Sequence, residues 1–330
     1  MPKPYKALSL LSGGLDSQLA VCVLREQGIH VEGIVYNSPF FGTDKAEAAA
    51  KALGIPLHIV DFTEEILDRV QHPKYGIGGA MNPCIDCHAT MIERAGELME
   101  KWGFDFIATG EVLAQRPMSQ NKQSLGVVAR ASKFEDLLVR PLSAGLLPPT
   151  KPIREGWLDV DELPRFSGRN RTPQMELAKH FGIEDYPAPA GGCLLTEQRF
   201  GEKLKDLLDH EGPDEDRTNV WLLPTGRHIR LADDVKIIVG SCKEENDLLD
   251  EKAHAEDYRL TCPDIPSPLV IVPPNASEKQ LEMAAAICVR YAKNPEKQAL
   301  PVEIAKEGQT RVVEVAPMAP DRVVEFMITP

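Results

Sequence analysis

Short apolar runs alternate with helix-like segments through the first 110 residues. The runs VEGIVYN, PLHIVDF and FDFIATG have the length and the Val, Ile and Phe content of buried strands. Between them the apolar residues recur at helical spacing, and several of these segments end at or just before a glycine. This alternation indicates an α/β fold with a doubly wound parallel sheet. We expect strands at 31–37, 56–62 and 104–110, and helices at 17–27, 43–54 and 63–71.

The composition of the chain changes twice after this region. Residues 142–189 are rich in Pro, Arg and Gly, which is typical of an appended helical and loop region. From about residue 222, strand-like alternation and helical spacing mix, which predicts a smaller α+β domain. We therefore divide the chain into an α/β ATPase-type domain at 1–145, an appended region at 146–210 that completes the catalytic site, and a C-terminal domain at 222–330. In the last we expect strands at 227–240, 310–317 and 322–328, and helices at 241–253 and 277–293.

The charge of the chain restricts where nucleic acid could bind. The 330 residues carry a formal net charge of −13 at pH 7. Because phosphate contacts need clustered Lys and Arg, this acidity argues against an extended basic surface. Any RNA contact must be local. Two short basic clusters are candidates: Arg165, Arg169 and Arg171, and Arg227, His228 and Arg230.

Hydropathy and cysteine usage point to a cytoplasmic protein without a membrane partner. The longest apolar stretches are strand-sized, so none could span a bilayer of about 30 Å. The apolar run Ala7–Leu11 is shorter than the core of a signal peptide. Seven cysteines, an odd number, do not indicate a disulfide framework.

The segment SGGLDS, residues 12–17, stands between the first strand and the first helix. Glycines allow a backbone to approach an anion closely, and the N-terminus of a helix adds favourable charge. The segment is neither a Walker A loop nor a G-x-G-x-x-G motif. Asp16 needs a separate explanation, because a carboxylate repels phosphate unless it binds Mg²⁺ or fixes the loop by hydrogen bonds. Both roles remain open.

In a doubly wound sheet, ligands bind beyond the carboxyl ends of the strands. This rule places the loop beside the ends of two further predicted strands. The candidate nucleotide contacts are Ser12, Gly13, Gly14, Asp16, Ser17, Tyr36, Asn37, Ser38, Thr109 and Gly110, with Glu111 as a further residue that would support placement of nucleotide or substrate.

SGGLDS resembles the pyrophosphate-binding loop of the PP-loop ATP pyrophosphatases, whose signature is Ser-Gly-Gly-x-Asp-Ser after the first strand. The resemblance implies that the loop holds the β- and γ-phosphates of ATP while the bond between the α- and β-phosphates is cleaved, which leaves an adenylated substrate. Gly13, Gly14 and Ser17 would donate to pyrophosphate. Asp16 would act with Mg²⁺ or hold the loop.

Three cysteines are candidates for chemistry. Cys84 and Cys87 have C-x-x-C spacing at the predicted start of a helix, where the helix N-terminus lowers thiol pKa values and favours thiolates. Cys193 follows the segment PAPAGG. Three thiolates could therefore meet at the crevice, either as a metal site or as sulfur nucleophiles.

The segments NPCIDCH, FIATGE and GGC together resemble the tRNA thiolation branch of the PP-loop enzymes, especially the 2-thiouridine synthetases. In that branch, cysteines carry sulfur, or three of them hold a [4Fe–4S] cluster with one open iron. We rank a cluster on Cys84, Cys87 and Cys193 first, a persulfide relay between them second, and a structural zinc site that includes His88 third. The chain departs from the 2-thiouridine synthetases where they carry a Gly-Gly-Cys-Cys-like element, since Leu194 follows Cys193.

Residues 222–330 resemble the NFACT-type RNA-binding domain. The basic Gly-Ser-His segment of that family is replaced here by YRLTCPDIPSPLVIV. The domain is therefore either an RNA-binding module or a degenerate module used for packing or for protein partners.

These features predict an ATP-dependent RNA sulfurtransferase, with tRNA as the expected substrate. It would adenylate a uridine carbonyl and replace its oxygen with sulfur, using ATP, Mg²⁺ and a sulfur donor protein or sulfide. One alternative is a PP-loop ligase or amidase acting on a small carboxylate, which needs no paired cysteines. The other is a non-enzymatic RNA-binding adaptor, which needs no intact SGGLDS.

Overall fold

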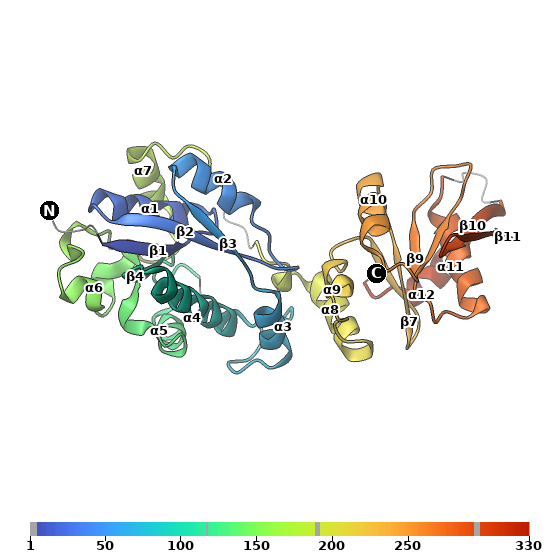
Figure 1. Cartoon of the computed structure of the whole chain (residues 1–330), viewed down its shortest axis with the longest axis horizontal. Coiled ribbons are helices and arrows are strands. Elements are labelled where there is room, and N and C mark those ends of the chain that lie inside the picture. The colour runs from blue at the N-terminus through green and yellow to red at the C-terminus, as the bar shows by residue number, and fades with distance from the viewer. Residues whose placement is uncertain (1–4, 117, 189–191, 294–297, 330) are drawn as a thin grey trace. The chain divides into compact units, whose positions relative to one another are not determined.

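The computed structural model describes residues 5–116, 118–188, 192–293 and 298–329 (Figure 1). It contains two compact units, residues 1–194 and residues 195–330. Each is described by itself below.

The first unit is built on a five-stranded sheet in which every pair of neighbouring strands is parallel. The strand order, 3-2-1-4-5, places β1 at the centre, and the chain reverses direction across the sheet on either side of it. This is the doubly wound α/β fold predicted from the alternating pattern, and that prediction is confirmed. From edge to edge the strands are β3 (Leu57–Asp61), β2 (His30–Asn37), β1 (Lys6–Leu10), β4 (Phe106–Thr109) and β5 (Leu138–Val139).

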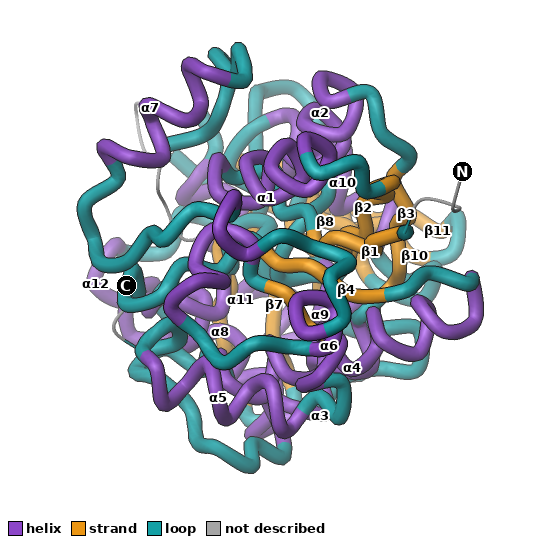
Figure 2. Tube along the Cα trace, turned by 90° about the vertical axis from the view of Figure 1, so that its left-hand side faces the viewer, coloured by secondary structure: helices purple, strands orange, loops and turns teal. Residues whose placement is uncertain are grey.

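Helices cover both faces of this sheet. In two perpendicular views α1 and α2 lie on one face, and α4 and α5 lie on the other (Figures 1 and 2). Apolar side chains of α1 and α2 pack with those of β1, β2 and β4 in one buried cluster. The helices are α1 (Leu15–Glu26), α2 (Asp44–Leu53), α3 (Thr63–Gln71), α4 (Cys84–Trp102), α5 (Lys122–Ala131), α6 (Lys151–Arg154) and α7 (Thr172–His180). Short 3-10 turns lie at η1 (Glu135–Leu137), η2 (Pro141–Leu146), η3 (Val160–Glu162) and η4 (Leu194–Thr196).

The second unit is an α+β domain with a six-stranded antiparallel sheet in the order 11-10-8-9-7-6. Helix α11 packs Ala284, Ala285 and Ile287 against this sheet in one buried cluster. The strands are β6 (Arg227–Ala232), β7 (Val235–Val239), β8 (Tyr258–Thr261), β9 (Val270–Val272), β10 (Leu300–Lys306) and β11 (Gln309–Val315). The helices are α8 (Gln198–His210), α9 (Thr218–Trp221), α10 (Lys243–Lys252), α11 (Glu278–Tyr291) and α12 (Pro320–Phe326).

One predicted strand is wrong. Residues 322–328 were expected to be extended because they are rich in Val and Phe, but they lie largely in helix α12. Pro320 occupies the first turn, where proline favours a helix start. Val323 is buried, and Phe326 and Met327, three and four residues later, pack against the same cluster. Helical spacing of these apolar contacts outweighs the strand propensity of the individual residues.

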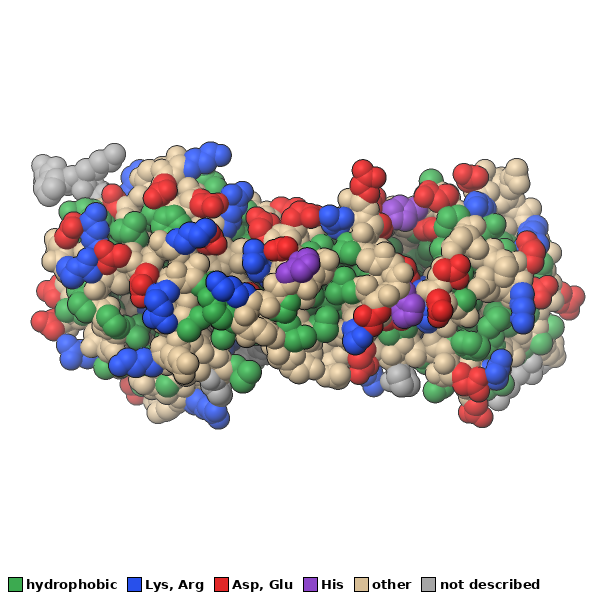
Figure 3. All heavy atoms as spheres, turned by 90° about the horizontal axis from the view of Figure 1, so that it is seen from below, with side chains coloured by type: hydrophobic (Ala, Val, Ile, Leu, Met, Phe, Trp, Pro, Cys, Tyr) green, Lys and Arg blue, Asp and Glu red, His purple; other side chains and the backbone are tan. Residues whose placement is uncertain are grey.

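The surface agrees with the acidic composition. Lys and Arg side chains are intermixed with Asp and Glu over the face of each unit that Figure 3 shows. No helix in the described ranges has the length and apolar character needed to cross a membrane.

Gly13 is the tightest backbone contact of the loop between β1 and α1. Its φ angle of +75° lies in the left-handed region, and a Cβ there would stand 2.3 Å from the backbone carbon and oxygen of Lys45 in α2. Such a contact requires the backbone to shift. Glycine at this position therefore serves both the turn and the close approach of two elements.

We predict that Gly13→Ala destabilises the first unit more than Gly28→Ala. Gly28 has nearly the same φ, +78°, but a Cβ there meets nothing within 4 Å. Gly28→Ala should cost only the left-handed strain of about 1–2 kcal/mol, whereas Gly13→Ala adds the clash with Lys45. Urea unfolding of both variants measures the difference, and equal losses would show that the Lys45 contact carries no cost.

Candidate active site

The loop at residues 12–17 presents free backbone donors at the carboxyl edge of the first sheet. Gly14 is the N-cap of α1, and no side chain caps the helix there. The first N–H groups of a helix have no intrahelical acceptors, so they remain available to an anion. The loop carbonyls are already engaged: Ser17 Oγ donates to the Gly14 carbonyl (2.8 Å), and Gln18 Nε2 donates to the Gly13 carbonyl (3.1 Å). Ser12 Oγ accepts from the Gly14 N–H at 3.4 Å.

Asp16 is held by a hydrogen bond from outside the loop. Gln115 Nε2 donates to Asp16 Oδ2 at 2.7 Å, and Gln174 Nε2 donates to Gln115 Oε1 at 2.9 Å. Asp16 Oδ1 is buried and has no hydrogen-bond partner among the described residues. The carboxylate thus fixes the loop through one oxygen, and the other oxygen is a hard ligand of the kind Mg²⁺ accepts.

The end of β4 lies against this loop. A Cβ at Gly110 would stand 2.5 Å from the Ser17 backbone nitrogen. The chain after β4 therefore passes so close to the first turn of α1 that a side chain at Gly110 would clash with it. Thr109 is buried, and its Oγ1 donates to Glu111 Oε2 at 3.2 Å. Thr109, Gly110 and Glu111 therefore form the wall beside the phosphate loop.

Glu111 is the centre of a buried charge network. Arg140 Nε donates to Glu111 Oε2 at 2.8 Å, and His88 Nδ1 lies 3.1 Å from Glu111 Oε1. Burial alone would raise the pKa of Glu111, but the charge of Arg140 and the bonds from His88 and Arg140 outweigh it and lower the pKa to about 2. The network joins the ends of β4 and β5 to the first turns of α4.

The three candidate cysteines are brought into one neighbourhood. Cys84 is the first residue of α4 and accepts a hydrogen bond from Asn82 Nδ2 at 3.1 Å. The Leu194 N–H donates to the Phe40 carbonyl at 2.9 Å, which ties the residue after Cys193 to the loop that follows β2. Burial first, then the nearby sulfurs of Cys193 and Cys84, raise the pKa of the Cys87 thiol well above its usual value.

The prediction of a lowered thiol pKa is therefore wrong for Cys87. It lies in the first turns of α4 as predicted, but its side chain is buried, and desolvation opposes the thiolate more strongly than the helix N-terminus favours it. Cys84 and Cys193 are only partly buried. Of the segment before Cys193, Pro189, Ala190 and Gly191 lie outside the described residues.

The spacing of the sulfurs bears on which metal group could fit. Among the described residues, only Asp214, Asp216 and His254 form a trio of His, Cys, Asp or Glu ligand atoms that all lie within 4.8 Å of one another. Cys84, Cys87 and Cys193 do not form such a trio, so the described residues do not hold these sulfurs in a preformed zinc tetrahedron. A four-iron cluster accepts wider spacing, because each thiolate bonds a different iron.

The predicted nucleotide contacts at the end of β2 are engaged within the protein. The Tyr36 hydroxyl donates to the Met91 carbonyl of α4 at 2.6 Å, and burial raises its pKa. The Asn37 carbonyl accepts from the Phe62 N–H at 2.9 Å. Ser38 Oγ accepts from the Phe40 N–H at 3.2 Å. These residues shape the edge of the crevice, and their contact with nucleotide stays a prediction.

In the second basic cluster, Arg227, His228 and Arg230, two of the three side chains bond to groups within their own unit. His228 is buried, and its Nε2 faces the carbonyls of Leu222 and Thr225 at 3.2 and 3.1 Å. Arg230 pairs with Asp206 and with Glu211. These two side chains therefore have structural partners already.

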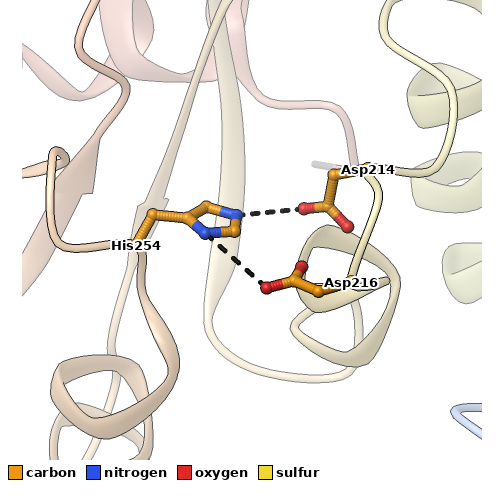
Figure 4. A group of neighbouring side chains, drawn as sticks. All are labelled: Asp214, Asp216 and His254. Carbon is orange, nitrogen blue, oxygen red and sulfur yellow. Dashed lines mark hydrogen bonds and ion pairs between the residues drawn. The ribbon is translucent and has the colours of Figure 1, made fainter.

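A group of acidic residues and histidine lies in the second unit (Figure 4). His254 Nε2 is 3.1 Å from Asp214 Oδ2, and His254 Nδ1 is 3.9 Å from Asp216 Oδ2. The Asn219 N–H also donates to Asp214 Oδ2, at 2.9 Å. The group is therefore accounted for as a tie between the turn before α9 and the turn after α10.

Several residues of the site had no role in the sequence-based prediction. Arg140, Gln115 and Asn82 each contact a predicted site residue, and Gln174 contacts Gln115. Only Arg140 carries a sequence signal, since an arginine directly after the apolar pair Leu138–Val139 needs a buried acidic partner.

Two family models match the chain. Residues 5–136 match the tRNA methyl transferase HUP domain, and residues 226–327 match the NFACT protein RNA-binding domain. The first unit thus carries a HUP domain, a family that implies the use of ATP, and the same chain carries an NFACT RNA-binding domain. This confirms the recognition of both domains from sequence.

The curated relatives that match the chain include tRNA-specific 2-thiouridylases. The MnmA enzyme of Marinobacter nauticus is 29% identical over 224 residues, which are 63% of this chain and 55% of the enzyme. That of Sulfurimonas denitrificans is 34% identical over 120 residues, 33% of this chain and 35% of the enzyme. A solved 4-thiouridine synthetase–RNA complex with bound ATP is 20% identical, covering 53% of this chain and 50% of that one, with a TM-score of 0.36. The longest of these matches covers about half the length of the curated relative.

We predict that the buried Glu111 makes the first unit sensitive to acid. A carboxyl whose pKa is lowered by folding stabilises the protein above the ordinary value of 4.5, and this contribution is lost as the pH falls toward 2. Between pH 5 and pH 2 the stability advantage of wild type over Glu111→Gln should shrink by about 3 kcal/mol. Urea unfolding at several pH values measures it, and parallel profiles would contradict the prediction.

Arg140→Met provides the matched variant. It leaves Glu111 buried without its cation and should cost about 3–5 kcal/mol at pH 7. The double variant Glu111→Gln with Arg140→Met should recover part of this loss, because no unpaired charge remains.

We predict opposite titrations for two histidines of the second unit. Partial burial would lower the pKa of His254, but the bond to Asp214 and the charges of Asp257 and Asp216 outweigh it and raise the pKa. Burial lowers the pKa of His228 well below 6.5. In ring ¹H–¹³C spectra, His254 should titrate above pH 6.5, while His228 stays neutral to well below that value.

The stability consequences have opposite signs. The His254 tie stabilises the unit below pH 6.5 and is lost as the pH rises through the raised pKa. The neutral His228 stabilises it above pH 6.5, and this contribution is lost as the pH falls through the lowered pKa. Coincident titration of the two rings would contradict both assignments.

Proposed function

We propose that the protein is an ATP-dependent sulfurtransferase that acts on RNA, with tRNA as its substrate. The observation that carries the proposal is that the phosphate loop and the cysteine-bearing start of α4 are connected through Gly110 and Glu111. Gly110 packs against Ser17 of the phosphate loop, and the next residue, Glu111, holds His88, which follows Cys87 on α4. An anion cradle and a set of thiols therefore share one edge of one sheet.

The phosphate loop acts first in this proposal. The free N–H groups at the start of α1 hold the β- and γ-phosphates of ATP, and Asp16 keeps the loop in place through Gln115. A carbonyl oxygen of uridine attacks the α-phosphorus, the bond to the β-phosphate breaks, and pyrophosphate leaves. The ring oxygen now departs as part of AMP, which is a far better leaving group than oxide.

The cysteines supply sulfur in the second step. Cys84 is partly exposed and accepts from Asn82, an arrangement that favours a reactive sulfur, whereas the buried Cys87 stays a thiol. A sulfur donor protein passes the outer sulfur of its persulfide to Cys84 and is left as a thiol. The outer sulfur on Cys84 attacks the ring carbon, and AMP leaves. The Cys193 thiolate then attacks the Cys84 sulfur, which leaves the transferred sulfur on the ring and a Cys84–Cys193 disulfide that an external thiol reduces.

A [4Fe–4S] cluster is the alternative sulfur carrier that the three cysteines fit. Cys84, Cys87 and Cys193 would hold it, and it would supply an open iron for sulfide.

The NFACT domain is the candidate RNA contact outside the catalytic unit. It would let a protein of net charge −13 hold RNA locally. A ligase acting on a small carboxylate has no use for three gathered thiols, and an adaptor has no use for the cradle at Gly14.

The test separates the two steps. Purified protein is incubated with ATP, Mg²⁺ and unmodified tRNA transcripts, in parallel with ³⁵S-labelled sulfide and with a small-molecule persulfide whose outer sulfur is ³⁵S-labelled, and both pyrophosphate release and label in RNA are measured. Cys84→Ser and Cys193→Ser should each lower labelling by about a hundredfold or more while pyrophosphate release persists, and Cys87→Ser should do so only if the three cysteines hold a cluster. Cys242→Ser, which changes an exposed cysteine of the second unit, is the control.

Iron and sulfide analysis of anaerobically purified protein then identifies the carrier. About four irons per chain, lost in each of the three variants, indicate the cluster. Iron-free active protein indicates the relay. Absence of both RNA-stimulated pyrophosphate release and RNA labelling would overturn the proposed function.

A further inference from the structure

Three unsatisfied polar atoms meet beside the phosphate loop. Asp16 Oδ1, Arg171 Nε and Gln174 Oε1 are all buried, and none has a hydrogen-bond partner in the described part of the chain. They belong to one connected group, because Gln115 bonds both Asp16 and Gln174, and Arg171 Nη2 lies 3.7 Å from Asp16 Oδ2. Gln174 is only 1% exposed. Buried polar atoms are rarely left without partners. Arg171 Nε is the one donor of these three atoms and therefore the one that an anion would satisfy, whereas the two oxygens suit a cation or a hydrogen-bond donor.

The position of Arg171 comes from the packing of α7 on α1. Arg171 precedes the first residue of α7, and Ala178 of that helix is buried with Leu15 and Leu19 of α1. The sequence makes the arginines of the segment RFSGRNR candidates for a local RNA contact. Its members differ in the structure: Arg169 is exposed, whereas the Arg171 side chain is 19% exposed and turned toward Asp16.

The phosphate loop supplies no cationic side chain of its own. Asp16 is the one charged residue of segment 12–17, and it is negative. A cationic side chain beside the loop adds to the stabilisation that backbone donors and Mg²⁺ give the phosphates. The distance of 3.7 Å between Arg171 Nη2 and Asp16 Oδ2 is longer than the 2.7–2.9 Å of a charge-assisted hydrogen bond, so the donors of Arg171 remain free for a stronger acceptor.

We propose that Arg171 is a phosphate-binding residue that contacts the β- or γ-phosphate of ATP and stabilises the departing pyrophosphate. Its planar guanidinium offers donors to phosphate oxygens, which a backbone amide or a single point charge does not match. Asp16, itself held by Gln115, keeps the side chain in position. The inference rests on the proposed use of ATP and adds a residue from the appended region to the loop of the α/β domain.

Isothermal titration of the full chain with two nucleotides tests the inference. α,β-Methylene-ATP carries the β- and γ-phosphates and is not cleaved between α and β, whereas AMP lacks both phosphates. Arg171→Ala should weaken the binding of α,β-methylene-ATP by about tenfold to a hundredfold, the effect of one charge-assisted hydrogen bond. AMP binding should change less than about twofold, and Arg171→Lys should restore part of the loss.

Arg169→Ala is the matched control, since it removes the same charge from an exposed site two residues away. Its affinity for α,β-methylene-ATP should equal that of wild type. Equal losses in both alanine variants, equal loss of AMP and α,β-methylene-ATP binding, or no loss in Arg171→Ala would each overturn the inference. Thermal unfolding of each variant checks that the fold is retained, and Arg171→Lys provides the comparison if Arg171→Ala is unstable.

The outcome also separates this inference from the proposed function. Wild-type protein that binds no α,β-methylene-ATP contradicts the use of ATP, and both fail. Wild-type binding with unchanged Arg171→Ala binding contradicts the role of Arg171 alone.

Discussion

The buried ion pair between Glu111 and Arg140 holds the carboxyl edge of the first sheet together. Removing two charges from water costs free energy, and a buried ion pair is stable only where hydrogen bonds also satisfy its remaining lone pairs and N–H groups. Glu111 also binds Thr109 and His88, and Arg140 reaches the Leu125 carbonyl of α5. One interaction thus fixes the ends of β4 and β5 relative to α4 and α5. The crevice wall beside the phosphate loop depends on that arrangement.

The same network explains how distant parts of the chain meet. Residues of α4 approach the wall through His88, while the segment that contains Cys193 is anchored on the opposite side by the Phe40 carbonyl after β2. Both anchors are bonds of residues next to the cysteines, so the two cysteine-bearing segments are positioned by their neighbours in the chain.

Much of the fold followed from sequence periodicity. The parallel sheet, the helices around it and the α+β character of the second unit were predicted because buried strands and amphipathic helices leave strong local patterns. α12 was not, because three Val and Phe side chains give the same composition in a strand and a helix, and only packing of Val323 decides. β5 is two residues long and leaves no periodic signal.

The site was predictable to a lesser degree. SGGLDS and the C-x-x-C pair are local motifs, and the end-of-strand rule correctly brought Thr109 and Gly110 to the loop. The burial of Cys87 and the occupied hydroxyl of Tyr36 could not be predicted, since both depend on neighbours remote in sequence. The same is true of Gln115, Arg171 and Gln174, whose meaning comes only from their convergence on Asp16.

The contact between Gly13 and Lys45 leaves no volume between the turn of the phosphate loop and the first turn of α2. Two surfaces in such contact cannot move independently. Inward displacement of α2 must therefore deform the turn, and an anion that immobilises the turn must also reduce the motion of the first turn of α2. The environment of the backbone amides at the start of α2 thus changes when an anion binds in the phosphate loop, without direct contact between them. The first turn of α2 and the phosphate loop therefore move as one rigid element.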